Sequence, residues 1–243
     1  MKARLLPVLG LFLLIFNTSC NFTENITIKS DGSGKMSLEM DASQFMALAG
    51  QQMAKEGQKK LDSTFTFKEY LASKKDSIAK LPKAEQERFK KLENITVHMV
   101  MDIESSACKL TMLSDFKKAA DMGDMMKGFS NLGSMNKKEA LPDLGLSKSK
   151  AEADYFYDGK KFKKTFVVQE TKAVVSDSVS MYKALFEGST YTVNYSFPKK
   201  IKSVSNKSAI IGTDKKSVSI AYPLNEYLDT PKTLDLEIEF EKK

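Results

Sequence analysis

The chain has 243 residues, enough for one large domain or two small packed lobes with a sizeable core. Hydrophobic residues make up 42% and charged residues 28%, as in ordinary globular proteins, and the formal net charge is +7. Because this charge is spread as lysine doublets among many acids, it indicates either a solvated surface or a face resting on anionic lipid head groups.

The first twenty residues carry the clearest functional signal. A basic start with Lys2 and Arg4 precedes an apolar run over 5–16, and a short polar stretch then ends on Cys20. The run is too short for the roughly 20 residues that a membrane-spanning helix needs. This layout predicts a secretory signal peptide over residues 1–19, and nucleic acid is not expected as a partner of an exported chain.

The same segment resembles a bacterial lipoprotein signal of the looser, Bacteroidota type, with Asn17 and Ser19 at the positions before the cysteine. The resemblance implies that Cys20 is acylated, as with palmitate, and anchors the mature protein to a membrane of the cell envelope. Firm anchoring needs several acyl chains, because one holds weakly. Residues 21–25 lack a dense acidic run, which favours the periplasmic face of the outer membrane over the cell surface. The alternatives are an ordinary secretory signal and an uncleaved N-terminal anchor.

After a lipidated tether at 20–25, residues 26–132 are predicted to form an α+β lobe of hairpins and helices. Apolar residues at period two indicate strands, and apolar residues at helical spacing indicate amphipathic helices. The expected elements are a hairpin over 26–40, a helix over 42–60, a helical region over 67–93 broken before Pro82, a hairpin over 97–112, and a helix over 115–130 capped by Ser114.

Residues 133–152 lack sustained periodicity and are predicted to be a linker or long loop, followed by a β-rich lobe over 153–243. Asp158-Gly159 is a favoured hairpin turn. The other expected elements are a helix over 177–187 ended by Gly188 and strands at 191–197, 201–204, 218–222 and 234–240. The sequence therefore predicts an α+β fold of antiparallel, hairpin-built sheets with several amphipathic helices packed on one face. The two lobes could also form one domain.

Two regions resemble the LppM-type domain, a family of envelope lipoproteins. They are the opening over 26–36 and the tail strands over 191–198 and 218–224. The resemblance implies a lipid-transfer-like α+β fold and hints at lipid binding. Family members end in a membrane helix, whereas this chain ends in Glu-Phe-Glu-Lys-Lys.

The sequence offers no recognisable catalytic set. Its one histidine, His98, lies in a predicted strand, and no G-x-S-x-G motif accompanies it. Once Cys20 is acylated, Cys108 has no cysteine partner, so no internal disulfide forms. One histidine and one thiol cannot supply a zinc site. We expect no catalytic residue, metal or cofactor, although an unrecognised enzyme stays a third interpretation.

Candidate ligand-lining residues lie in a Met-rich helical segment. Met122, Met125, Met126 and Phe129 could line an apolar groove, because thioethers are deformable filler on apolar surfaces. Packing in the core is the simpler interpretation, and a Cu(I) site is another. Together with the anchor, this segment predicts a non-catalytic envelope lipoprotein that binds an apolar ligand, a lipid or a protein partner. The alternative is a structural or assembly subunit of an envelope complex.

Three serines follow an aspartate in the manner of the O-glycosylation acceptor of Bacteroidota-type exported proteins. They are Ser63, Ser77 and Ser178. The stretch 62–78 reads as an exposed helical surface, so glycosylation is predicted there first.

Overall fold

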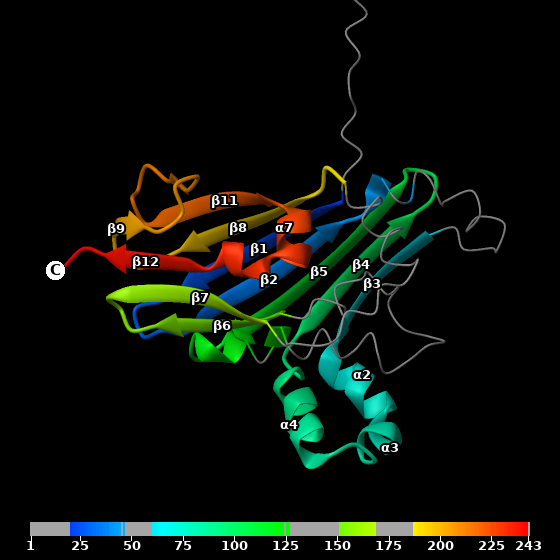
Figure 1. Cartoon of the computed structure of the whole chain (residues 1–243). Helices are drawn as coiled ribbons and strands as arrows, with labels where there is room; N and C mark the ends of the chain where they lie inside the picture. Colours follow the sequence, from blue (N-terminus) through cyan, green and yellow to red (C-terminus); the bar gives the residue numbers. More distant parts are fainter. Residues whose placement is uncertain are drawn as a thin grey trace, which may run out of the picture.

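Two packed β-sheets form the body of the molecule, which is described by a computed structural model covering residues 20–44, 46, 60–123, 125–126, 151–168 and 187–242 (Figure 1). The large sheet has eight strands in the order β10-β11-β8-β1-β2-β5-β4-β3. The small sheet has four, in the order β6-β7-β12-β9. With its short helices, the fold is of the mixed α+β kind that the sequence predicts.

The strands of the large sheet are β1 (Asn21–Ile28), β2 (Gly34–Asp41), β3 (Lys60–Thr66), β4 (Thr96–Asp102), β5 (Ala107–Phe116), β8 (Thr190–Ser196), β10 (Ile210–Ile211) and β11 (Ser217–Pro223). Those of the small sheet are β6 (Ala151–Tyr157), β7 (Lys161–Val168), β9 (Ile201–Val204) and β12 (Leu236–Phe240). The described helices are α2 (Phe67–Ser73), α3 (Lys75–Ile78), α4 (Lys83–Lys91), α7 (Leu224–Asp229) and the 3₁₀ helix η2 (Pro231–Leu234).

Strands from both ends of the chain meet in the middle of the large sheet. β1 pairs in parallel with β8, with Phe22 opposite Tyr191 and Ile26 opposite Tyr195. The predicted linker over 133–152 therefore does not divide the sheets into an N-terminal and a C-terminal set. Residues 21–25, expected to be a tether, are instead the first five residues of β1, where alternate side chains are buried.

Hairpins dominate the remaining pairing, as the sequence predicts. The β1–β2 and β6–β7 turns each place a glycine at positive φ, Gly32 at 82° and Gly159 at 79°, a conformation that glycine adopts without strain. Gly34 is required for a different reason. A Cβ there would lie 2.0 Å from the carbonyl oxygen of Thr27, so only glycine allows β1 and β2 to approach this closely.

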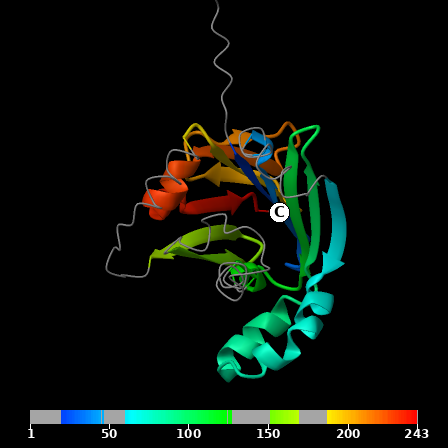
Figure 2. The same cartoon turned by 90° about the vertical axis from the view of Figure 1, so that its right-hand side faces the viewer.

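The helices differ most from expectation. Within the part of the chain that the structure describes they are few and short, and α2 to α4 lie beyond the ends of β3 and β4 instead of packing across a sheet face (Figures 1 and 2). Ser114 is not a helix cap. It is buried within β5, opposite Met36, because its strand continues the period-two pattern to Phe116. Most of the helices predicted at 42–60 and 177–187 lies outside the described residues.

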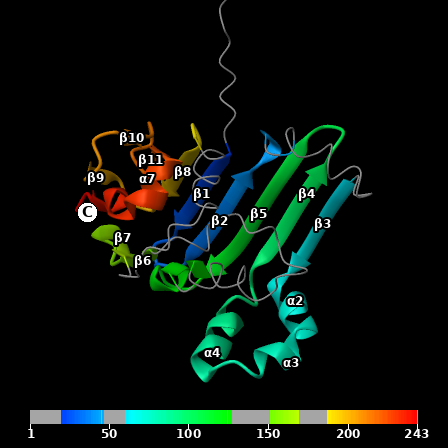
Figure 3. The same cartoon turned by 45° about the vertical axis from the view of Figure 1, so that its right-hand side comes forward.

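The inner face of the large sheet, which faces the small sheet, has two parts (Figure 3). Over β11, β8, β1 and β2, here called the covered half, inward side chains such as Tyr195, Val193 and Ile26 are each 1% exposed. Over β5, β4 and β3, here called the edge half, inward side chains grow more exposed toward the last strand. Met99 and Met101 of β4 are half-buried, and Leu61 of β3 is 38% exposed.

Candidate functional site

A buried polar cluster joins the two sheets at the centre of the covered half. Glu24 of β1 is 0% exposed and Lys164 of β7 is 2% exposed, and the Lys164 Nζ lies 2.7 Å from the Glu24 Oε2. Both residues stand at inward positions of strands that are otherwise apolar on that face, so folding brings the two charges together between the sheets. A buried charge is stable only when it is paired and hydrogen-bonded.

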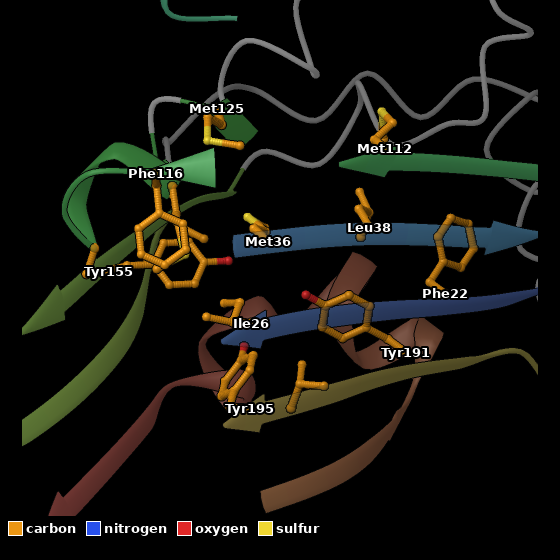
Figure 4. Packing of buried hydrophobic residues seen from close by; sticks show 14 of the residues in the cluster. Phe22, Ile26, Met36, Leu38, Met112, Phe116, Met125, Tyr155, Tyr191 and Tyr195 are labelled. Atoms are coloured by element: carbon orange, nitrogen blue, oxygen red, sulfur yellow. The ribbon is translucent and has the colours of Figure 1, made fainter. Parts of the chain in front are cut away.

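Three tyrosine hydroxyls complete the cluster, and they converge on one point in Figure 4. Tyr155 and Tyr195 donate to the Glu24 Oε1 at 3.0 and 2.7 Å, and Tyr191 donates to the Glu24 Oε2. The Lys164 ammonium also donates to the Tyr191 and Tyr195 hydroxyls, at 2.8 and 3.3 Å. Both carboxylate oxygens therefore accept two hydrogen bonds each, and every charge is satisfied within the protein.

Burial and the contacts within the cluster shift the pKa values of its members. Burial would raise the pKa of Glu24, but the charge of Lys164 and the hydrogen bonds from Lys164, Tyr191 and Tyr195 outweigh it and hold that pKa below its usual value. Burial lowers the pKa of Lys164, and the neighbouring Glu24 carboxylate opposes that change. The pKa of Tyr195 lies well above its usual value, because the side chain is buried and faces the Glu24 carboxylate. Tyr195 therefore stays a protonated donor.

This arrangement can hold the two sheets together, but it is not suited to acid-base catalysis. A general acid or base must reach a proton on a substrate, whereas Glu24 and Lys164 are enclosed and their hydrogen-bonding groups are already used. A signal for the cluster exists in the sequence: Phe22, Glu24 and Ile26 alternate, as do Phe162, Lys164 and Phe166. Two opposite charges at inward positions of facing strands are expected to pair. By its place in the sequence, however, Lys164 belongs to one of the lysine doublets, and no motif singles out Glu24.

Cys20 lies at the end of the sheet, directly before β1. Its side chain is buried, at 6% exposure, and the next residue is already paired with Asp41 of β2 and Thr190 of β8. No spacer therefore separates the predicted lipid-bearing residue from the folded sheet. Cys108, the other cysteine, is half-buried on the inner face of β5, and burial raises the pKa of its thiol.

The predicted Met-rich segment is packed against the inner face of the large sheet. Met122 is 0% and Met125 is 5% exposed, while Met126 is partly buried. Met125 borders a pocket of about 10 Å³ that is also lined by Met36, Leu38, Met112, Leu113 and Ser114 (Figure 4). That volume holds about one water molecule, so this pocket in its present form accepts no lipid chain. Phe129 lies outside the described residues.

The histidine is a half-exposed sheet residue, as its position in the strand predicts. The His98 Nε2 lies 2.9 Å from the Asp62 Oδ1 on the outer face, where both side chains are accessible to water. Within the described ranges, no three His, Cys, Asp or Glu side chains are grouped so that they could hold a metal ion. The described helices include none that is long and apolar enough to span a bilayer.

The predicted glycosylation sites fall in different settings. Ser63 lies in β3 and is half-buried on the inner face, which corrects the expectation of an exposed helix at 62–64. Ser77 is exposed in α3, and Ser178 lies outside the described residues. Modification of these serines stays a prediction.

The sequence matches no family model. It matches no curated protein. Among solved structures, the chain is similar to the folded domain of the Mycobacterium tuberculosis LppM protein, determined by NMR. The match covers 92% of this chain and 91% of that chain, with 8% identity and a TM-score of 0.38. The LppM-type resemblance and the Bacteroidota-type origin stay predictions from the sequence. With so low an identity and TM-score, the function proposed below rests on this chain's own residues.

Proposed function

We propose that the protein is a non-catalytic lipoprotein of the cell envelope, held to the membrane through acylated Cys20, whose domain binds the hydrocarbon chain of a lipid. The observation that carries the proposal is the placement of Cys20. A signal peptide ends where the folded domain begins, so cleavage before Cys20 would remove residues 1–19 and leave every described strand intact. The outer membrane, with the domain on its periplasmic face, is the proposed address.

Metabolic labelling with palmitate tests the anchor. Wild-type protein should carry the label, start at Cys20 and fractionate with membranes, whereas Cys20→Ser should lose the label. Cys108→Ser is the matched control, because it removes the other thiol and should keep both the label and the membrane fraction. A label that survives Cys20→Ser would refute acylation at this residue.

The proposed lipid site is the inner face of the edge half. Met99, Met101 and Cys108 are half-buried there, and Phe65 and Leu61 of β3 continue the same face. Directly opposed residues of an antiparallel sheet share one face, so these side chains form an apolar surface, which Ser63 interrupts on β3. Methionines suit a flexible hydrocarbon chain, because they adapt their shape without exposing polar atoms.

Two substitutions on one strand test this site. Met101→Asn places an amide on the inner face of β4, and Val100→Asn places the same amide on the outer face. We expect lipid to remain bound to wild type and Val100→Asn during native mass spectrometry, and to be lost from Met101→Asn. Wild-type protein free of lipid after mild detergent extraction, or equal retention by both variants, would contradict the site.

A structural or assembly subunit is the second candidate, and the edge strand favours it. In the described sheet, β3 pairs with β4 on one side and ends the strand order on the other. An unpaired strand edge can accept a strand from another protein. A partner recovered at constant stoichiometry from detergent-solubilised envelopes, with no lipid in the same eluate, would support this function over lipid binding.

A further inference from the structure

Lysine-rich turns that are far apart in the sequence gather at the end of the molecule opposite Cys20. This surface, here called the lysine end, consists of residues 29–33, 117–121, 158–160, 197–200, 212–216 and 241–242. Each turn follows or precedes a strand whose other end points toward Cys20, and the turns lie at the left of Figure 1. The eight residues of β1 separate the two ends by about 26 Å, at about 3.3 Å per residue.

Direct contacts join these turns into one surface. The Lys199 Nζ donates to the Gly159 carbonyl oxygen at 2.7 Å, which connects the turn after β8 to the β6–β7 turn. Backbone amides of Ile201 and Glu241 donate to the carbonyl oxygens of Lys215 and Lys200, at 2.6 and 2.9 Å. The lysine doublets therefore converge in space, which their spacing in the sequence does not show.

At the lysine end, lysines outnumber acids, and the two kinds of side chain differ in their contacts. The surface contains nine lysines and five acids. Four of these acids accept hydrogen bonds from backbone amides of their own turns and so lie against the backbone: Asp31, Asp121, Asp158 and Asp214. In contrast, Lys29, Lys160, Lys200, Lys215 and Lys216 are exposed, and the described residues give none of them an ion pair. Exposed lysines without an ion pair are thus more numerous at this end than acids that are free of the backbone.

Around Cys20 the balance is reversed. Lys60 and Lys109 are paired there with Asp102 and Asp41, at 3.7 and 3.4 Å. Glu104, Glu187 and Glu226 add further negative charge at the same end. Among the described residues, the excess of positive charge therefore lies at the lysine end and not around Cys20.

Two exposed isoleucines adjoin the lysines and indicate what kind of anionic partner fits. Ile210 is 72% and Ile211 is 42% exposed, and both belong to β10, directly before the turn that holds Lys215 and Lys216. A soluble polyanion offers nothing for exposed isoleucines to contact. A bilayer does, because apolar side chains enter its interface while neighbouring lysines meet the lipid phosphates.

We propose that the lysine end docks on an anionic phospholipid bilayer, with Ile210 and Ile211 entering the interface and Lys160, Lys200, Lys215 and Lys216 contacting lipid phosphates. This contact is separate from the anchor at Cys20 and does not depend on acylation. It gives the domain a second membrane-binding surface, of defined orientation.

The test uses the full chain with Cys20→Ser and sedimentation with vesicles. Vesicles of phosphatidylcholine with roughly one phosphatidylglycerol in three lipids should bind the chain at about 0.1 M salt, where the Debye length is about 10 Å, and release it at about 1 M, where it is about 3 Å. Vesicles of pure phosphatidylcholine measure any contribution of the apolar run at 5–16, which does not need anionic lipid. The contact at the lysine end is measured as the binding that phosphatidylglycerol adds to this baseline.

Matched variants then locate the contact. Changing Lys160, Lys200, Lys215 and Lys216 to Gln should weaken that added binding roughly 600-fold, since each lysine near an anionic surface is worth about fivefold. The control changes Lys68, Lys80, Lys83 and Lys90, which are exposed around α2 to α4, and removes the same charge. It should bind as the parent chain does. Equal losses in both sets would overturn the proposal, as would no loss in either.

A third variant separates a bilayer from a soluble polyanion. Ile210→Ser with Ile211→Ser should weaken vesicle binding roughly tenfold, because two apolar side chains no longer enter the interface. The same variant should leave the binding of inorganic polyphosphate unchanged. Tight binding of polyphosphate together with no vesicle binding by the parent chain would refute the membrane contact.

Discussion

The covered half and the edge half belong to one sheet, yet they differ in the polar groups that they bury and in their exposure to water. In the covered half, the small sheet excludes water and a complete ion pair with three tyrosines lies at the centre. In the edge half, the inner face holds Met99, Met101 and Cys108, which are only partly buried. A buried charge can remain where a second sheet supplies its counter-charge. Half-exposed apolar side chains have no such constraint, and the proposed lipid site lies among them.

The largest effects should come from separating the two charges of the covered half. Glu24→Gln leaves Lys164 buried without a counter-charge and should lower the free energy of unfolding by about 3–5 kcal/mol. Lys164→Met should cost a similar amount, because it leaves the Glu24 carboxylate buried. The double variant removes both charges at once, so its cost should fall below the sum of the single costs by about 1–3 kcal/mol.

Urea unfolding of the three variants and wild type, with linear extrapolation, measures this cycle. The control pair is Lys161→Met and Glu237→Gln, whose side chains form a half-exposed ion pair at 2.7 Å. Exposed pairs contribute little, so that cycle should show a coupling below about 1 kcal/mol. Additive costs for Glu24 and Lys164 would mean that the cluster is not the link between the sheets.

Truncating an apolar side chain should lower stability more in the covered half than in the edge half. Phe162 is 0% exposed, and its ring lies 5.3 Å from the rings of both Tyr195 and Phe197. Phe162→Ala should cost about 3–5 kcal/mol, because it opens a cavity between the sheets. Met101→Ala should cost under about 1 kcal/mol, because its side chain already contacts water. Thermal unfolding followed by circular dichroism measures both, and similar losses would contradict the division into halves.

The sequence predicts local pairing better than long-range assembly. The hairpin at 97–112 and the hairpin turn at Asp158-Gly159 are confirmed, because a turn signal and period-two apolar residues are both local. The parallel β1–β8 pair joins residues about 169 apart, as in the contact of Asn194 with Asn25, and no local pattern specifies it. Ser114 was predicted to be a cap because serine favours that position, but tertiary pairing with β2 decided its structure.

The candidate functional residues also separate into those that local sequence indicates and those that only the topology brings together. The sequence indicates Cys20 and the Met-rich segment, because both are contiguous signals. The Glu24–Lys164 pair requires two strands 140 residues apart to face each other, and the lysine end requires six turns to meet. The ingredients of both are visible as residue types, but the topology decides that they come together.

The free energy of unfolding at acid pH should depend on the charge of Glu24 in the covered half. The pKa of Glu24 in the folded protein lies below its usual value of 4.5, so the unfolded chain takes up the proton first as the pH falls. The contribution of Glu24 is therefore fully present above about pH 4.5 and is lost as the pH falls through the folded pKa. In Glu24→Gln, the free energy of unfolding should vary less with pH in this window.

An exposed carboxylate provides the contrast in the same acid titration. Hydrogen bonds from Lys161 and Lys163 lower the pKa of Glu237 to about 2, but this side chain is solvated. Added salt should weaken the pH dependence that comes from Glu237 and leave that of Glu24 almost unchanged, because buried pairs are screened much less. Urea titrations from pH 7 to pH 2 at two salt concentrations separate the two. If salt abolished the difference between wild type and Glu24→Gln, the charge of Glu24 would have to be accessible to solvent.

The smallest predicted effect tests whether the edge half can open by itself. Thr66 ends β3 and caps α2: its hydroxyl accepts from the Glu69 amide at 3.4 Å, while the Glu69 carboxylate accepts from the Thr66 amide at 2.9 Å. Thr66→Ala removes the hydroxyl and should cost about 1 kcal/mol, whereas Thr66→Ser keeps the cap and should cost less. Amide hydrogen exchange of Thr66→Ala should speed up in β3 and α2 and stay unchanged in β1 and β8, because the cap stabilises only its own end of the sheet. Faster exchange throughout β1 and β8 would instead show that the two halves unfold as one unit.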